Sequence, residues 1–283
     1  MSSEPTATES AAAQSIAGQP QSTDDLKVKQ DGGVEQVKEG EQKEGGDKTV
    51  FDDAGNFNVK HPLFSQWTLY FSSPHVKNVP KTPSTAAAPA GQASGWMEDM
   101  RKVAKFDSVE EFWGLHNNIV PPSTLGQKAD YYLFKEDIIP AWEDSANKNG
   151  GKWSVQLPKE KTKATIDQMW LYTMLAAIGE TYETDAGSKD MGEPSDDLVT
   201  GVIVNVRPAF FRLNIWTRQA PTDPNEPSPL LERILKIGRH FKKDVLGYEL
   251  DAKLMQSGYS TEVEFINHKD GEKKLKAKKI VLN

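Results

Sequence analysis

Residues 201–217 read Gly-Val-Ile-Val-Asn-Val-Arg-Pro-Ala-Phe-Phe-Arg-Leu-Asn-Ile-Trp-Thr. Two runs rich in β-branched and aromatic residues, 201–207 and 212–217, stand on either side of a short link that contains Pro208. Such residues favour strands, and the spacing is typical of a hairpin, so the two runs predict neighbouring antiparallel strands. Further strand-like runs are expected at 67–72, at 131–135, at 153–157 and in a Lys-rich segment that ends with residues 280–282.

Three helices are predicted among these strands. The first begins after Ser108, which has Glu111 three positions on, as in a capping box. The second covers about 163–178 and ends at Gly179, and the third begins at Ser228-Pro229, a cap followed by proline in the first turn. A sheet with helices packed on one face is an α+β fold, and that is the fold class we expect.

Composition divides the 283 residues into a tail and a globular part. Residues 1–58 contain few large apolar side chains, and such a segment cannot bury enough surface to offset its chain entropy. We therefore expect a disordered acidic tail over 1–58 and one domain over 59–283. Within the domain, flexible insertions are expected near 79–95, which is rich in Pro, Ala, Gly and Ser, and near 184–199, which is acidic and Gly-rich.

Charge and motif content argue against several classes of function. The net charge of −7 lies entirely in residues 1–58, which hold 12 acidic and 5 basic residues; residues 59–283 hold 29 of each (41 minus 12, and 34 minus 5). The basic field of a general nucleic-acid binder is therefore absent, and any nucleic-acid site must be small. Cysteine is absent, and so are a phosphate-binding Gly-rich loop, a His pair with metal-ligand spacing and a Gly-x-Ser-x-Gly elbow. We expect a protein that binds without catalysis and needs no cofactor or metal.

The amino terminus has no basic-then-apolar run, and no stretch approaches the roughly 20 apolar residues of a membrane helix. We therefore expect the protein in the cytoplasm, with or without a nuclear fraction.

The clearest candidate for a binding site is Trp142-Glu143. An indole can stack on guanine while a neighbouring carboxylate accepts hydrogen bonds from the N1–H and N2–H groups of that base. Trp96, in a loop, is a candidate for the other face of the base. A methyl group on N7 makes guanine cationic, which adds cation–π attraction of about 0.5–2 kcal/mol for each ring. Arginine and lysine suit phosphate oxygens, and Arg207 and Arg212 stand at adjoining strand ends.

Each of these residues also has a structural interpretation. Trp67, Trp153 and Trp170 lie in patterned strands or helices and are expected in the core. A strand-end arginine is most often a solvated charge, and Glu143 followed by Asp144 is also what caps a helix. Taken singly, the residues leave these alternatives open.

Several phrases in a fixed order resemble the eukaryotic translation initiation factor 4E family of cap-binding proteins, over roughly residues 57–260. They are His61-Pro62-Leu63 with Trp67, Lys105-Phe106-Asp107, Val109 to Trp113, Tyr132 to Lys135, Trp142-Glu143-Asp144, Gly150 to Trp153, Trp170-Leu171, Ile178-Gly179-Glu180, Val204 to Arg207, Ile215-Trp216-Thr217 and Ile237-Gly238-Arg239. The resemblance implies a single curved antiparallel sheet, backed by three long helices on its convex face, with the cap bound in the concave face.

By this resemblance the cap is held by seven residues, Trp96, Trp142, Glu143, Lys152, Arg207, Arg212 and Trp216. Trp96 and Trp142 are implied to stack on the base, Glu143 to accept from the guanine edge, and Trp216 to pack on the N7-methyl group. The three cations are implied to hold the phosphates, with Lys152 in the place of a common arginine.

A second site is implied on the convex face, where an exposed patch of Trp and Leu usually marks a partner. In the family this face receives a helical peptide of the type Tyr-x-x-x-x-Leu-apolar, from the scaffold factor 4G or from 4E-binding proteins. Its implied residues are His61, Pro62, Val109, Trp113, Leu171 and Leu175. The sequence thus predicts a translation initiation factor that binds capped mRNA and recruits 4G. The alternatives are a repressor homologue that binds the cap without the scaffold, and a nucleotide or cap hydrolase.

Overall fold

The structure, a computed structural model, describes residues 48–53, 55–74, 100–183, 197–252, 255–256, 259–260, 262–272 and 278–282. The predicted insertion at 79–95, with Trp96 beside it, lies outside the described residues, as do residues 1–47 of the predicted tail and 184–196 of the second insertion. Within 48–58, a turn is held by the Asp52 carboxylate, which accepts from the Thr49 backbone N–H at 2.8 Å. The tail and the insertions otherwise stay predictions.

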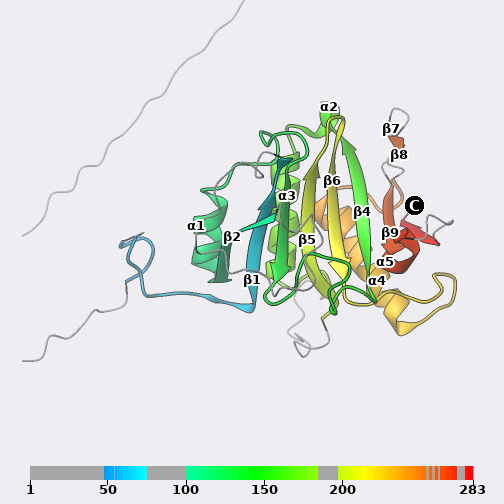
Figure 1. Ribbon diagram of the computed structural model, residues 1–283, viewed down its shortest axis with the longest axis horizontal. Coiled ribbons are helices and arrows are strands. Elements are labelled where there is room, and N and C mark those ends of the chain that lie inside the picture. Colours follow the sequence, from blue (N-terminus) through cyan, green and yellow to red (C-terminus); the bar gives the residue numbers. More distant parts are fainter. Residues whose placement is uncertain are drawn as a thin grey trace, which may run out of the picture. The chain divides into compact units, whose positions relative to one another are not determined.

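One antiparallel sheet of eight strands organises the described part of the chain, in the order β10-β9-β4-β6-β5-β3-β1-β2 (Figure 1). Its strands are β1 Pro62–Ser72, β2 Met100–Ser108, β3 Asp130–Lys135, β4 Gly151–Pro158, β5 Val199–Val206, β6 Phe210–Thr217, β9 Val263–Asn267 and β10 Lys279–Leu282. The short strands β7, Met255–Gln256, and β8, Tyr259–Ser260, pair separately. The predicted fold class, a curved antiparallel sheet with helices, is confirmed.

The hairpin predicted from 201–217 is present as β5 and β6, which pair in antiparallel register up to Val206 opposite Phe211. The Arg207 backbone N–H donates to the Phe210 carbonyl at 2.9 Å and closes the link. Strand β5 begins at Val199, so the second predicted insertion extends too far: its last residue already belongs to the sheet.

The helices are α1 Val109–His116, α2 Lys159–Thr162, α3 Ile166–Ile178, α4 Pro229–His240 and α5 His268–Glu272, and a π-helix, η4 Phe241–Val245, continues α4. Both predicted caps are present: Ser108 Oγ accepts from Glu111 N, and Ser228 Oγ accepts from Leu231 N at 3.1 Å. The second predicted helix, about 163–178, is present as α3, and the short helix α2, which was not predicted, ends just before it. Thr165 stands at this break and bonds through its hydroxyl to the Thr162 carbonyl, a local bond that competes with helix continuation.

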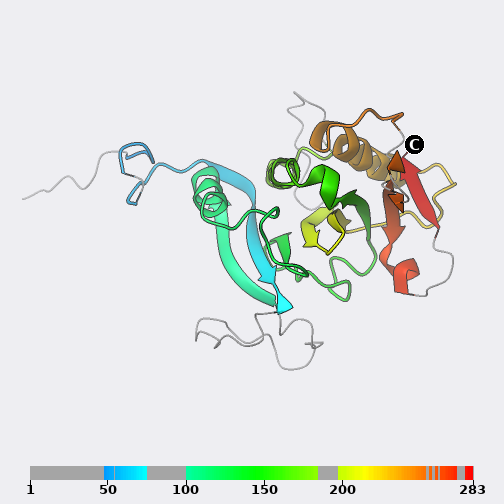
Figure 2. The same cartoon turned by 90° about the horizontal axis from the view of Figure 1, so that it is seen from above.

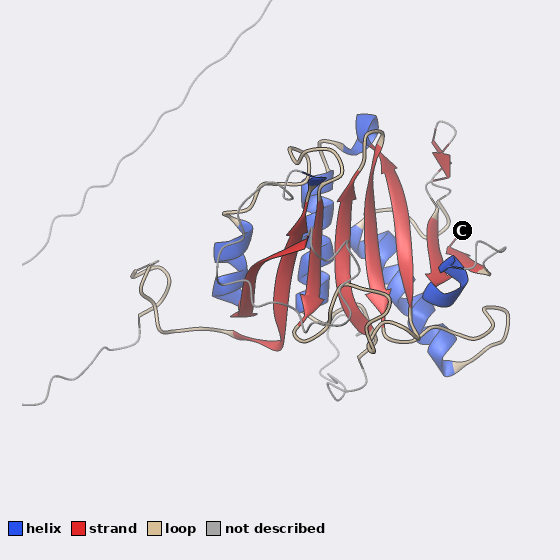
Figure 3. Ribbon diagram, in the orientation of Figure 1, coloured by secondary structure: helices blue, strands red, loops and turns tan. Residues whose placement is uncertain are grey.

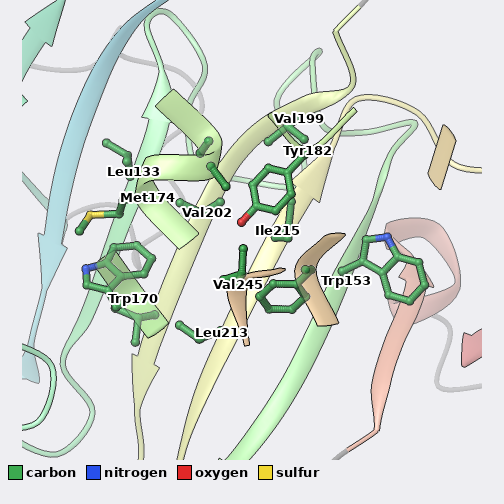
Figure 4. Close-up of a cluster of buried hydrophobic side chains, with 14 of the residues drawn as sticks. Leu133, Trp153, Trp170, Met174, Tyr182, Val199, Val202, Leu213, Ile215 and Val245 are labelled. Carbon is green, nitrogen blue, oxygen red and sulfur yellow. The ribbon is translucent and has the colours of Figure 1, made fainter. Parts of the chain in front are cut away.

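The long helices α3 and α4 cover one face of the sheet, and Figure 3 shows them in blue behind the red strands. In the turned view of Figure 2, α3 (green) and α4 (orange) lie on the same side of the strands. Trp67, Trp153 and Trp170 are buried in the core, as predicted, and Figure 4 shows two of them among aliphatic side chains. Trp153 also donates through Nε1 to the Ile234 carbonyl of α4 at 3.0 Å. Among the helices of the described ranges, none combines the length and the hydropathy that crossing a bilayer requires.

Candidate functional site

The sheet face opposite the core carries most of the residues predicted to bind a ligand. Lys152 pairs with Trp216, and Arg212 pairs with both Gln156 and Asn205. Cross-strand partners, and residues two apart on one strand, point to the same side of a sheet. Lys152, Arg212 and Trp216 therefore share one face, which we call the open face.

Trp216 stands in a small apolar cluster on the open face, together with Phe134, Ile138 and Ile203. Its ring meets Phe134 edge-to-face, with 5.6 Å between centroids and an interplanar angle of 80°. A Cβ atom at Gly201 would lie 2.4 Å from the Phe134 ring, so only glycine leaves room for that ring beside Trp216. The cluster is a tightly packed apolar surface on the open face, on which Trp216 is held in place.

His268 supports Trp216 from the start of α5, with 4.4 Å between the ring centroids. Burial, and then the nearby charge of Lys152, lowers the pKa of His268 to about 4. The imidazole is therefore neutral at pH 7, and its Nε2 is buried with no hydrogen-bond partner among the described residues. No spacing in the sequence indicated that His268 belongs to this site.

The loop between β3 and β4 brings Trp142 and Glu143 to the open face. Its Ile138 belongs to the Trp216 cluster, and in Figure 1 this green loop crosses the lower ends of β5 and β6. Asn147, fully buried, donates through Nδ2 to the Ile139 and Ala141 carbonyls, each at 2.9 Å. The loop is thus tied to itself and to the sheet.

The adjacent acids of this loop have different surroundings. Asp144 accepts from the backbone N–H groups of Ile139, at 3.0 Å, and Ala146, at 2.8 Å, so it shapes the turn. Glu143 is exposed and has no partner in the described part of the chain, and Trp142 beside it is 44% exposed. An indole face and a free carboxylate are therefore presented together.

Arg207 is held at the end of β5 by Asp130 of β3. Its NH1 donates to Oδ1 at 2.6 Å and its NH2 to Oδ2 at 3.2 Å, a bidentate pair that fixes the plane of the guanidinium. Tyr132 also donates to Asp130, at 3.2 Å, and burial raises the pKa of Tyr132 to about 12. Asp130 had no role in the sequence prediction, yet it orients Arg207, a residue predicted to bind phosphate.

Lys152 and Arg212 have no carboxylate partner among the described residues. Burial lowers the pKa of each, and a neighbouring cation lowers it further: Arg212 acts on Lys152, and Arg207 acts on Arg212. The three cations therefore stand close enough to repel one another. A bound anion would relieve that repulsion, so the group favours a phosphate. In the same described ranges, no group of three or more His, Asp or Glu residues is arranged to hold a metal ion.

The open face thus combines an exposed indole, a free carboxylate, a buried indole floor and three cations. The sequence profile of the family described as eukaryotic initiation factor 4E matches residues 62–280. This chain belongs to the eukaryotic initiation factor 4E family.

Relatives in this family match most of the chain. Initiation factor 4E-1 of Schizosaccharomyces pombe is 38% identical over 226 residues, which cover 80% of this chain and 84% of the relative. The Saccharomyces cerevisiae factor 4E is 36% identical over 196 residues, 69% of this chain and 76% of that protein.

Solved structures of the family share the fold. Ascaris suum initiation factor 4E-3 in complex with an m7G cap has a TM-score of 0.57 and 28% identity, over 79% of this chain and 98% of that one. Caenorhabditis elegans factor 4E-3 in complex with the 4E-binding protein Mextli has a TM-score of 0.55 and 27% identity, over 78% of this chain and 100% of that one.

The second surface that the 4E resemblance implied begins where β1 meets α1. The His61 carbonyl accepts from Val109 N at 2.9 Å, and the His61 N–H donates to the Glu110 carboxylate at 2.9 Å. Pro62 pairs with Ser108, which places it beside the helix start. His61, Pro62 and Val109 are therefore neighbours at one exposed corner.

Trp113 lies one turn further along α1 and is 38% exposed, so it is not a core residue. Its ring is edge-on to Phe112, at 5.2 Å, and to His116, at 5.6 Å, which limits its rotation. On α3, Leu171 and Leu175 are half-buried.

Proposed function

We propose that this protein binds the 7-methylguanosine cap of messenger RNA without catalysis and recruits the scaffold factor 4G. The observation that carries the first part is the loop that presents Trp142 and a free Glu143 beside Trp216 and three cations. The cap complex of the Ascaris relative, a chain of the same fold, supports it.

In the proposed complex the base stacks on Trp142, with Trp96 as the second ring, and Glu143 accepts hydrogen bonds from N1–H and N2–H. Trp216 packs against the N7-methyl group. The methylated base carries a positive charge, so each desolvated indole face contributes about 0.5–2 kcal/mol of cation–π attraction that unmethylated guanine lacks. The carboxylate of Glu143 favours the same cation. Selectivity for the methyl group thus arises from charge.

The phosphates extend from the base toward Lys152, Arg207 and Arg212. Arg207 arrives already oriented but partly neutralised by Asp130, whereas the other two cations are unpaired among the described residues. We infer that Lys152 and Arg212 contribute most of the electrostatic attraction for the phosphates. Arg207 contributes mainly by fixing the orientation of the phosphate group that it binds.

The test of cap recognition is Glu143→Ala. Hydrogen bonds to a charged group contribute about 1.5–3 kcal/mol, so affinity for 7-methyl-GTP should fall about 10- to 100-fold, measured by tryptophan fluorescence and by retention on immobilised 7-methyl-GDP. The matched control is Glu226→Ala, which removes an exposed acid from another loop and should change neither value. Undiminished retention of Glu143→Ala would remove the proposed contact to the guanine edge. Metal-dependent turnover of a capped dinucleotide would instead favour a hydrolase.

Scaffold recruitment is tested by Trp113→Ala. An exposed aromatic anchor commonly contributes more than 2 kcal/mol to an interface, so affinity for a 4G-derived helical peptide should fall at least tenfold while cap affinity stays unchanged. Leu250→Ala, at an apolar residue that is 36% exposed elsewhere, is the control for unspecific loss. Equal loss of cap and peptide binding would show that Trp113 is structural. A wild-type chain that binds the cap but no 4G peptide would favour the repressor class.

A further inference from the structure

Asn214 occupies the middle of β6 on the open face, between Arg212 and Trp216. Residues two apart on a strand are separated by roughly 6.5–7 Å, so its side chain stands about midway between the two. A ligand whose base lies at Trp216 and whose phosphate lies at Arg212 must pass over this position. No motif in the sequence singled out Asn214.

The hydrogen bonding of Asn214 is incomplete. Its side chain is 3% exposed, and Nδ2 donates to Asn205 Oδ1 of β5 at 3.0 Å. The other branch of the amide, Oδ1, is buried with no partner in the described part of the chain. On the other side of β6 lies β4. A buried acceptor of this kind loses its water and gains nothing in return, so it needs a donor.

Strand β4, which pairs with β6, carries a side chain that can donate to Asn214 Oδ1. Ser154 of β4 is directly opposite Asn214, and Lys152, two residues earlier, is its diagonal neighbour on the same face. Diagonal neighbours in a sheet are about 7–8 Å apart at Cα, within reach of a long side chain. The Lys152 ammonium has three donors and no partner among the described residues. An unpaired donor and an unpaired acceptor thus occupy diagonal positions on two neighbouring strands.

We propose that Asn214 is a positioning residue of the phosphate subsite: when a phosphate group binds, Oδ1 accepts from Lys152 a hydrogen bond that this structure does not contain, and holds that ammonium beside Arg212. Lysine loses much rotational freedom when it is fixed, and a ready acceptor offsets part of that cost. Asn214 itself does not touch the ligand. This inference rests on the proposed function, because it assigns the ligand as a phosphate ester whose base lies at Trp216.

The experiment separates phosphate binding from base binding. The full chain is titrated with 7-methylguanosine, 7-methyl-GDP and 7-methyl-GTP, in the wild type and in Asn214→Leu, which keeps the branched shape and removes the acceptor together with the donor to Asn205. We expect affinity for 7-methyl-GTP to fall about 5- to 10-fold while affinity for the nucleoside stays within twofold. Asn214→Ala, which adds no branched side chain to the sheet, should give the same pattern and guards against a misfolded Leu variant.

A double-mutant cycle with Lys152→Met shows whether the effect passes through the lysine. In the Lys152→Met background, adding Asn214→Leu should cause no further loss. The inference is overturned if the losses multiply, or if Asn214→Leu and Asn214→Ala weaken nucleoside and triphosphate by the same factor. A wild-type chain that binds GTP as tightly as 7-methyl-GTP overturns the proposed function first, and is distinguishable because it needs no variant.

Discussion

At the scale of single residues, the support behind Trp216 makes stability depend on pH. His268 has a pKa of about 4 in the folded protein, whereas an exposed histidine has about 6.5. Between pH 6.5 and 4, His268 therefore binds a proton in the unfolded chain but not in the folded chain. The stability that depends on a neutral His268 is fully present above pH 6.5 and is lost as the pH falls from 6.5 to 4. At pH 4.5 this histidine should have cost about 2–3 kcal/mol of the free energy of unfolding, measured by urea denaturation.

The matched variant is His268→Phe, which keeps a ring against Trp216 and removes the titration. Other groups, such as Glu110 with its pKa of about 2, titrate in both chains, so the difference between the two chains isolates the histidine. The difference in unfolding free energy between the two chains should be constant above pH 6.5 and should shift by about 2–3 kcal/mol in favour of His268→Phe as the pH falls to 4.5. Parallel curves would show that His268 takes up its proton at the same pH in the folded and the unfolded chain, and that the burial behind Trp216 does not shift its pKa.

At the scale of elements, the loop between β3 and β4 depends on one buried amide. Asn147→Ala leaves the carbonyls of Ile139 and Ala141 without their donor and frees the segment that carries Trp142. Each lost bond costs roughly 1 kcal/mol, and a loosened loop must be ordered again on binding. We expect about tenfold weaker binding of 7-methyl-GTP, together with faster amide exchange in 136–150 but unchanged exchange in β5 and β6.

The control for this prediction is Asn118→Ala, which removes a similar bond, from Nδ2 to the Gly114 carbonyl at 2.7 Å, at the end of α1. It should leave cap affinity unchanged. Faster exchange throughout the sheet in Asn147→Ala would mean that the residue supports the whole fold and not the loop.

Elements with a strong local signal were predictable from sequence, and those without one were not. The 201–217 hairpin and the Ser108 and Ser228 caps follow from residues that are adjacent in the chain. Strand β2 did not, because it is an edge strand in which charged residues such as Arg101, Lys102 and Lys105 interrupt the apolar alternation. Strand β9 was also missed, because Ile266 directly follows Phe265 and interrupts the alternation of apolar and polar residues in this short run.

At the scale of the whole molecule, the same distinction applies to the site. Trp142, Glu143 and the cations were found because their motifs resemble a family. Asp130, which lies 77 positions from the Arg207 that it orients, could not be found, because only the sheet brings the two together. The same holds for His268 behind Trp216. The residues that we propose to contact the ligand stand in sequence motifs, whereas the residues that orient them are identified only by tertiary contacts.

The distribution of charge gives a prediction for the whole chain. The domain is formally neutral, and the net charge of −7 resides in residues 1–58. The cap carries a negative triphosphate, so the acidic segment should slow its encounter with the open face. Replacing Glu35, Glu39, Glu41 and Glu44 by Gln changes the net charge from −7 to −3. We expect the association rate of 7-methyl-GTP, measured by stopped-flow fluorescence, to rise about twofold at 0.01 M salt.

This increase should vanish near 0.15 M salt, where charges more than about 8 Å apart are screened, and the dissociation rate should not change at either concentration. Replacing Gln14, Gln19, Gln21 and Gln30 by Asn, which leaves the charge unaltered, is the control for composition. An effect that persists at 0.15 M, or that appears in the dissociation rate, would mean that these glutamates contact the bound ligand or its loop. The acidic segment would then belong to the site and would not act only through its field.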